Sequence, residues 1–209
     1  MPERRVLQAR KQASYRRRQD YFEPRQKFLI VCEGEKTEPN YFKKFPIPKD
    51  CVVSVTGIGA NTDSLVRKAI ELKGQANYHQ VWVVFDRDSF TPEHFNKALQ
   101  LAQANDIKVA YSNEAFELWY ILHFMYLDTG ITRDDYCSRL GQDDCLGRKY
   151  LKGSETIYDE LLSRQSKAIE RAKRLLAQYE PPNPVLDKPS TTVHLLVEQL
   201  NRLFWDKDS

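Results

Sequence analysis

Gln80-Val81-Trp82-Val83-Val84-Phe85 runs directly into Asp86-Arg87-Asp88. An uninterrupted apolar run of this length is typical of a strand that helices cover on both faces, as in a parallel sheet. Open parallel sheets place their ligand sites beyond the carboxyl ends of the strands. The stretch therefore predicts a central strand that delivers two carboxylates to such an edge.

A second stretch of the same kind lies about 50 residues earlier. Phe28-Leu29-Ile30-Val31-Cys32 is apolar throughout and runs into Glu33-Gly34-Glu35. Weaker strand patterns cover residues 51–56 and 107–111. Helical patterns lie between and after the strands, at about residues 39–45, 62–72, 92–102 and 114–125. This alternation predicts an α/β fold, with a central parallel sheet flanked by helices.

Beyond Asp128 the pattern becomes helical. The expected helices cover residues 133–140, 155–179 and 191–204, and Pro181-Pro182-Asn183-Pro184 predicts a stiff linker before the last of them. We therefore expect a basic arm over residues 1–26, a sheet domain over 27–128, and a helical C-terminal extension over 129–209 packed on the same core.

The composition is that of a soluble globular protein. Of the 209 residues, 41% are hydrophobic and 29% are charged, which favours neither disorder nor a membrane protein. No apolar run approaches the roughly 20 residues of a membrane span, and residues 1–27 lack the apolar centre of a secretory signal. The four cysteines show no metal-binding or CxxC spacing. We expect a cytoplasmic protein with reduced thiols.

The charge is unevenly distributed. Residues 1–27 carry nine basic and three acidic side chains, a net +6, so the remaining chain sums to −3 against the total of +3. A basic arm on an acidic body suggests contact with a phosphate backbone. Tyr15, Tyr21 and Phe22 interleave the arginines and could stack on bases. A solvated tail is the competing interpretation.

Glu33, Asp86 and Asp88 form the constellation that carries chemistry. They follow two apolar strands, so their carboxylates are expected at one edge of the sheet. Oxygen-rich sites suit Mg²⁺ or Mn²⁺. We expect one or two such ions. The candidates for further metal ligands, in order of preference, are Glu35, Glu117 and Glu38. Each acid alone could instead be a solvated loop carboxylate; the combination favours a metal site.

Several polar side chains could contact nucleic acid. Each has a structural alternative as well: an ion pair for Lys36, a helix cap for Asn113, a solvated loop for Lys149 and Lys152, and a solvated helix face for a basic stripe. That stripe has the i, i+3, i+7, i+10 spacing of one helix face and consists of Arg164, Lys167, Arg171 and Arg174.

Two of these motifs resemble those of Toprim domains. Phe28-Leu29-Ile30-Val31-Cys32-Glu33-Gly34 is similar to the first Toprim motif, a strand that ends in glutamate and glycine. Val83-Val84-Phe85-Asp86-Arg87-Asp88 is similar to the DxD motif. The resemblance implies that Glu33 acts in acid/base chemistry or binds metal, and that Asp86 and Asp88 bind Mg²⁺.

The chain also resembles a narrower group, the RloB-like family with its AbiLii-type abortive-infection proteins. The resemblance rests on Val31-Cys32-Glu33-Gly34-Glu35-Lys36-Thr37-Glu38-Pro39-Asn40-Tyr41-Phe42, on Ser112 to Trp119 with Leu122-His123-Phe124, and on Pro189-Ser190-Thr191-Thr192-Val193. Glu114 departs from it, since proline is expected there. The resemblance implies an antiphage role beside an ATPase partner. This chain itself has no GxxxxGK[ST] loop for ATP.

We expect a Mg²⁺-dependent nuclease that hydrolyses phosphodiesters of DNA or RNA. One alternative is a non-catalytic Toprim-fold subunit that binds nucleic acid within an ATPase-containing complex. Another is a phosphatase of the haloacid-dehalogenase type, since Phe85-Asp86-Arg87-Asp88-Ser89 imitates a nucleophilic DxD. That reading leaves Glu33 without a role.

Overall fold

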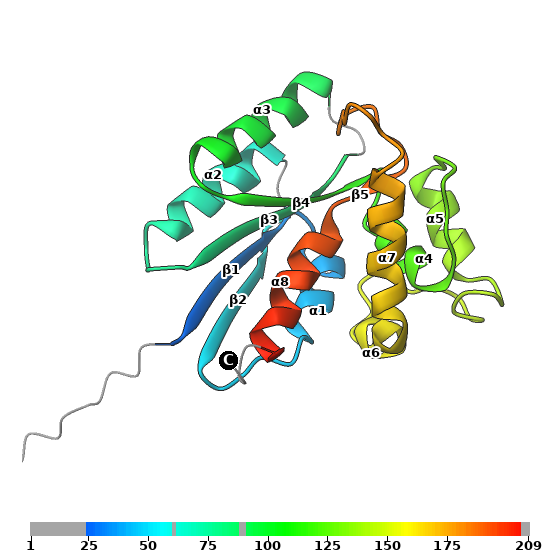
Figure 1. Cartoon of the computed structure of the whole chain (residues 1–209), viewed down its shortest axis with the longest axis horizontal. Helices are drawn as coiled ribbons and strands as arrows, with labels where there is room; N and C mark the ends of the chain where they lie inside the picture. The colour runs from blue at the N-terminus through cyan, green and yellow to red at the C-terminus, as the bar shows by residue number, and fades with distance from the viewer. Residues whose placement is uncertain (1–23, 60–61, 88–90, 206–209) are drawn as a thin grey trace, which may run out of the picture.

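The computed structural model describes residues 24–59, 62–87 and 91–205. A five-stranded sheet runs through its centre in the order β2-β1-β3-β4-β5 (Figure 1). The first four strands are parallel, and β5 pairs antiparallel with β4. The strands are β1 (Gln26–Cys32), β2 (Cys51–Gly57), β3 (Gln80–Asp86), β4 (Lys108–Asn113) and β5 (Ser190–Thr191). The predicted α/β fold with a mostly parallel central sheet is confirmed.

Helices cover both faces of the sheet, with two on one face and the others on the opposite side (Figure 1). They are α1 (Thr37–Lys43), α2 (Thr62–Lys73), α3 (Pro92–Ala104), α4 (Glu117–Phe124), α5 (Arg133–Leu140), α6 (Ile157–Leu161), α7 (Gln165–Leu176) and α8 (Val193–Trp205). The two-helix face carries α2 and α3. None of the helices in the described ranges is long and apolar enough to cross a membrane.

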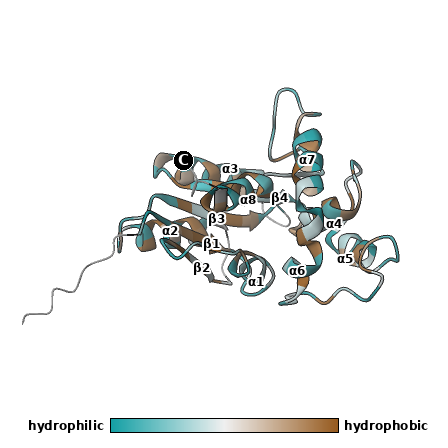
Figure 2. Cartoon of the chain, turned by 60° about the horizontal axis from the view of Figure 1, so that its bottom comes forward, coloured by the Kyte–Doolittle hydropathy of each residue, from teal (hydrophilic) through white to brown (hydrophobic). Residues whose placement is uncertain are grey.

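Alternate residues of the central strands point to opposite faces of the sheet. In β1, Leu29 and Val31 join the cluster under α2 and α3, whereas Phe28 and Ile30 join the larger cluster on the other side. The strands of the sheet are accordingly made mostly of hydrophobic residues, whereas the helices around them mix hydrophobic and hydrophilic ones (Figure 2). The same alternation places Asp86, which follows Trp82 and Val84 by even steps, on the face that α1 and α4 cover.

The helices beyond residue 128 belong to the larger of the two clusters. Tyr136 of α5, Leu175 of α7 and Leu200 of α8 are buried in it together with Phe28 of β1. Tyr158 of α6 reaches the aromatic group on α1, with its ring 5.3 Å from that of Tyr41 in an edge-on contact. Such ring pairs add about 0.5–1.5 kcal/mol beyond the area they bury.

Three predicted helix boundaries are wrong. The helix expected from Glu114 begins at Glu117. The helix expected over 155–179 is broken by a 3₁₀ turn at Leu162–Arg164, which separates α6 from α7. The turn lets the buried faces of both short helices reach the core. The helix expected from Thr191 begins at Val193, because Thr191 belongs to β5, where its hydroxyl hydrogen-bonds with that of Ser112 across the sheet edge.

His123 near the end of α4 makes the stability of the fold sensitive to pH. Its Nδ1 donates to the carbonyl of Trp119 at 2.9 Å, and burial lowers the pKa of the imidazole to about 4. An unfolded histidine titrates near pH 6.5. Between these two values the unfolded chain binds the proton more readily, so acid destabilises the fold through this group.

We expect this histidine to cost about 2 kcal/mol of unfolding free energy at pH 5 relative to pH 7.5. Urea unfolding at the two pH values, compared between the wild-type chain and His123→Gln, measures it. The variant should lose less stability on acidification by about that amount, whereas exposed His94→Gln should behave as wild type. Equal losses in all three proteins would contradict the assignment.

Candidate metal-dependent active site

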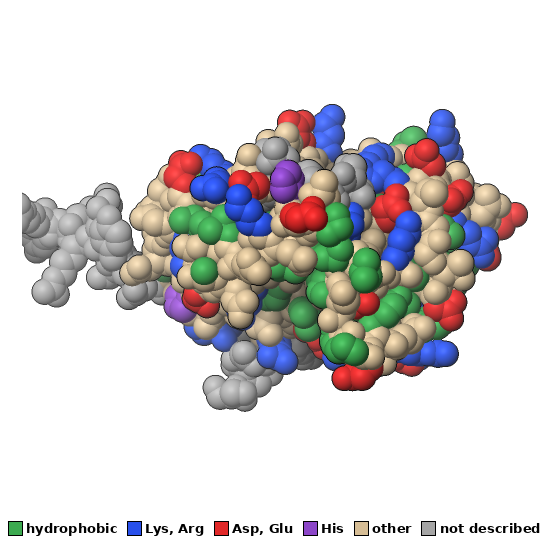
Figure 3. All heavy atoms as spheres, turned by 90° about the horizontal axis from the view of Figure 1, so that it is seen from above, with side chains coloured by type: hydrophobic (Ala, Val, Ile, Leu, Met, Phe, Trp, Pro, Cys, Tyr) green, Lys and Arg blue, Asp and Glu red, His purple; other side chains and the backbone are tan. Residues whose placement is uncertain are grey.

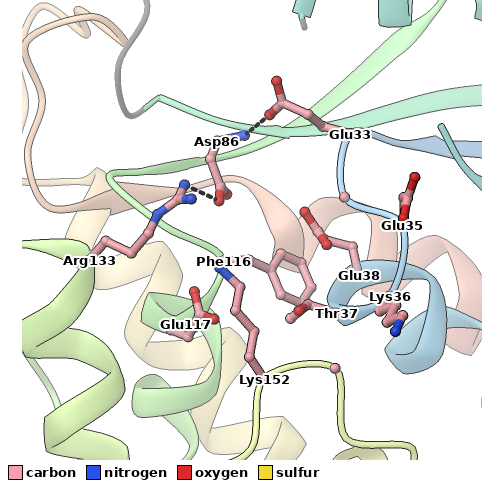
Figure 4. A pocket seen from close by; sticks show the side chains of 12 residues that line it. Glu33, Glu35, Lys36, Thr37, Glu38, Asp86, Phe116, Glu117, Arg133 and Lys152 are labelled. Atoms are coloured by element: carbon pink, nitrogen blue, oxygen red, sulfur yellow. Dashed lines mark hydrogen bonds and ion pairs between the residues drawn. The ribbon is translucent and has the colours of Figure 1, made fainter. Parts of the chain in front are cut away.

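Glu33 and Asp86 meet at the carboxyl ends of neighbouring strands. Strands β1 and β3 pair in register with Cys32 beside Val84, so the residues that follow are adjacent. The Glu33 side chain accepts a hydrogen bond from the Asp86 backbone N–H at 3.1 Å. The carboxylate of Asp86 points the other way, into a cavity of about 370 Å³ (Figure 4).

Two further carboxylates face Asp86 from helices. Glu38 on α1 and Glu117 on α4 line the same cavity and are almost fully buried, with exposed fractions of 6% and 1%. Figure 4 shows both pointing toward the space below Asp86. The Tyr150 hydroxyl donates to Glu117 Oε1 at 3.1 Å, which fixes that side chain.

Gly34 lies directly against the Glu38 carboxylate, so any larger residue there would force that side chain to move. A Cβ at residue 34 would lie 2.3 Å from Glu38 Oε2, closer than such atoms ever approach. The glycine therefore lets the loop after β1 pass directly over the carboxylate. This is a physical reason for the Glu-Gly pair at the end of the strand.

Arg133, the first residue of α5, enters the cavity from the opposite side. Its Nη2 lies 2.9 Å from Asp86 Oδ2 in an ion pair. The second oxygen, Oδ1, is buried and has no hydrogen-bond partner in the part of the chain that the structure describes. Asp86 thus keeps one carboxylate oxygen for another ligand.

The electrostatics of the cavity favour a cation. Burial raises the pKa of the Asp86 carboxyl well above its ordinary value, and the carboxylates of Glu38 and Glu117 add to the rise. Arg133 opposes it, whereas Glu33 adds to it. Burial also raises the pKa of Glu38, and the nearby Glu117 contributes. Carboxylates that repel one another in a desolvated site are stabilised by a proton or a metal ion.

The donor set fits a hard divalent cation, although the carboxylates do not yet enclose one. Buried oxygen donors and the unpartnered Asp86 Oδ1 are what Mg²⁺ or Mn²⁺ require. As they stand, no three acidic, histidine or cysteine side chains among the described residues converge closely enough to hold an ion. Asp88, the third predicted ligand, lies outside the described residues.

The structure separates the three candidates for further metal ligands. Glu35 is exposed beside Gly59 and points away from Asp86, while Glu38 and Glu117 are buried and point toward it (Figure 4). The geometry therefore favours Glu117 and Glu38 over Glu35 as further metal ligands. The sequence leads us to expect Glu35 first and Glu38 third, so the order of these two is reversed. The sequence did hold a sign of the role of Glu38. This residue ends the acidic stretch Glu33-Gly34-Glu35-Lys36-Thr37-Glu38 and falls in the first turn of α1.

The predicted nucleic-acid contacts lie in different environments. Lys36 and Lys152 line the cavity, and Lys149 is exposed nearby in sequence. Asn113 is buried, and its side-chain amide donates to the Asp187 carbonyl at 2.9 Å, so it ties β4 to the segment before β5. A binding role for these residues stays a prediction.

The basic stripe begins in the 3₁₀ turn, continues on α7 and packs mainly against the end of α4. Arg171 donates to the Leu122 and His123 carbonyls, which the helix end leaves without intrahelical partners. Arg164 lies over the ring of Phe124 and Arg174 over that of Tyr126. Exposed Lys167 pairs with Glu170. These contacts give three of the four side chains a structural role.

On the side of the molecule that Figure 3 shows, the described residues form no strong basic patch that could bind nucleic acid in place of the α7 stripe. There, basic and acidic side chains are interspersed among the residues that the structure describes. Non-specific attraction to a phosphate backbone would therefore depend on the cavity lysines and on residues 1–23 of the predicted arm, which lie outside the described part.

Fold and site together define an α/β protein with a cluster of buried carboxylates at the carboxyl edge of its sheet. The family model of the RloB-like proteins matches residues 28–200. The chain therefore belongs to the RloB-like family. Comparison with curated proteins and with solved structures gives no match.

Proposed function

We propose that this chain is a divalent-metal-dependent phosphodiesterase that cleaves DNA or RNA in antiphage defence. The observation that supports this most is the meeting of Asp86 with Glu38 and Glu117 in one cavity, beside Glu33. The RloB-like family is compatible with a defence role. The Toprim resemblance of the strand ends connects the same residues to phosphodiester chemistry.

In this proposal the chain's own residues hold the ion and the substrate. Asp86 offers its unpartnered Oδ1, and Glu117 and Glu38 supply neighbouring oxygens. Glu33 fixes the end of β3 through the Asp86 N–H and is placed to handle a proton. When bound, the cation polarises the phosphodiester and lowers the pKa of the attacking water. Asp88 would complete the ligand set.

The positive side chains at the cavity are suited to the nucleic-acid backbone. Lys152 reaches the cavity from the loop that precedes α6, and Lys36 lies on the loop after β1. Lysine ammonium groups bind phosphate as point charges. The basic arm over residues 1–26 leads into the amino end of β1, whereas the cavity lies beyond its carboxyl end, so the arm would supply a separate contact with the nucleic-acid backbone. An ATPase partner, implied by the family resemblance, would control access.

The test is a cleavage assay with labelled DNA and with total RNA, in Mg²⁺, in Mn²⁺ and in EDTA. Wild type should cleave only with a divalent ion, and Glu33→Gln should lower the rate at least about 100-fold. Glu71→Gln is the matched control, because Glu71 is exposed on α2, on the other face of the sheet, and its described partners are Lys68 and Gln75. The substrate that is cut identifies DNA or RNA.

Three outcomes would contradict the proposal. Cleavage that persists in EDTA or in Glu33→Gln would remove this site from the chemistry. Silence of the chain, both alone and with the adjacent ATPase, would favour the non-catalytic subunit, in which the Asp86–Arg133 pair is only structural. Cleavage that appears on adding the ATPase would mean that the nuclease is licensed by its partner. Hydrolysis of p-nitrophenyl phosphate alone would favour a phosphatase.

A further inference from the structure

Arg133 is the cation that Asp86 binds in the structure. Its guanidinium comes from α5, more than 40 positions along the chain, and forms the 2.9 Å ion pair at the cavity wall. The Arg133 side chain is 33% exposed, whereas that of Asp86 is 11% exposed. The arginine is thus the more accessible member of the pair.

The position of Arg133 is not explained by the stability of its helix. It is the first residue of α5, where the positive end of the helix dipole disfavours a basic side chain. A capping box between Thr132 and Asp135 already completes this helix start and fixes its direction. Among the described residues, the pairing with Asp86 is an interaction that the arginine gains from this position.

The cavity carries more negative than positive groups. Its lining includes five carboxylates (Glu33, Glu35, Glu38, Asp86 and Glu117) against three cations (Lys36, Arg133 and Lys152), an excess of two negative charges when all are ionised. A divalent cation would balance that excess. It would also compete directly with the guanidinium, because both are attracted to the same Asp86 carboxylate.

We propose that Arg133 is a resident counter-ion that a divalent cation displaces from Asp86, and that the displaced guanidinium then binds the phosphate of the substrate. The inference rests on the proposed nuclease function and adds a residue to it. Arginine suits the second role, because its planar fork donates two parallel hydrogen bonds to a phosphate. An exchange of partners would couple metal loading to substrate binding.

The experiment measures Mn²⁺ binding by electron paramagnetic resonance and nucleic-acid cleavage on the full chain. Without its competitor, Arg133→Gln should bind Mn²⁺ about tenfold more tightly, which corresponds to loss of one moderate ion pair. Its cleavage should nevertheless fall about 100-fold at saturating Mn²⁺. Opposite changes in metal affinity and rate are not expected from a residue that merely supports the fold.

Two further variants control the result. Arg133→Lys keeps the charge without the fork, so Mn²⁺ affinity should stay near wild type while cleavage still falls. Arg139→Gln, on the same helix but paired with Asp144 at the exposed end, should change neither quantity. Thermal unfolding of each variant shows whether the fold is retained, and Arg133→Lys remains informative if Arg133→Gln does not fold.

Suppose that wild type binds Mn²⁺ and cleaves, but Arg133→Gln binds Mn²⁺ no more tightly than wild type. That result would overturn the inference and leave the proposed function standing. Full cleavage by both Arg133 variants would overturn the phosphate-binding half. A wild-type chain that binds no Mn²⁺ and cleaves nothing, with or without the ATPase, would overturn the proposed function together with the inference.

Discussion

Asp86→Asn is expected to reduce cleavage by about 100- to 1000-fold while the chain stays folded. The substitution keeps the shape of the side chain and removes the negative charge that faces Glu38 and Glu117. An amide oxygen can still accept a hydrogen bond from Arg133. A metal ion, in contrast, loses the carboxylate whose Oδ1 has no hydrogen-bond partner among the described residues.

Stability separates a catalytic role from a structural one. Because the substitution relieves repulsion between buried carboxylates, thermal unfolding of Asp86→Asn should occur at the wild-type temperature or above it. The control is Asp106→Asn, at an aspartate whose side chain is 98% exposed. Its cleavage rate should match that of wild type. A strongly destabilised Asp86→Asn, or one that cleaves normally, would contradict the account.

Gly57→Ala should damage both fold and site. A Cβ at the end of β2 would lie 2.3 Å from the Gly34 carbonyl oxygen and 2.8 Å from the Pro39 side chain. Backbone atoms cannot yield as a flexible side chain does, so the loop that carries Glu33 must shift. Overpacking of this kind costs about 1–3 kcal/mol, and a displacement of about 1 Å at an active site can cost about 100-fold in rate.

The measurement combines urea unfolding with the cleavage assay. Gly74→Ala is the matched control, because a Cβ after α2 would meet only carbonyl oxygens at 3.4 Å or more. That variant should lose little stability and no activity. If Gly57→Ala were as stable and active as Gly74→Ala, the close approach of β2 to the loop after β1 would not hold the site in place.

The fold could be predicted because its signals are local. The apolar runs 28–32 and 81–85 are each long enough to identify a central strand. The helical patterns between them leave parallel pairing as the consistent arrangement. The acids directly after these runs then had to fall at one edge of the sheet. In the structure the Asp86 N–H donates a hydrogen bond to the Glu33 side chain, so these two residues lie side by side at that edge.

The rest of the site depends on long-range packing. Glu35 and Glu38 lie three positions apart in the sequence. Only the placement of α1 against the sheet decides which of them faces Asp86. Arg133 gave a weak signal, an arginine in the first turn of a helix before two aspartates. Its partner is 47 residues distant, and no local pattern specifies that contact. The break between α6 and α7 likewise follows from packing, since the sequence stays helical through residues 162–164.

The most direct test of the central claim is the position of a bound ion. An anomalous difference map from crystals of the full chain grown with Mn²⁺ locates it without an assumed substrate. The account predicts a peak in the carboxylate cavity, about 2.0–2.2 Å from an oxygen of Asp86, with Arg133 turned away. No peak there at saturating Mn²⁺, or one held elsewhere while the Asp86–Arg133 pair remains intact, would contradict it.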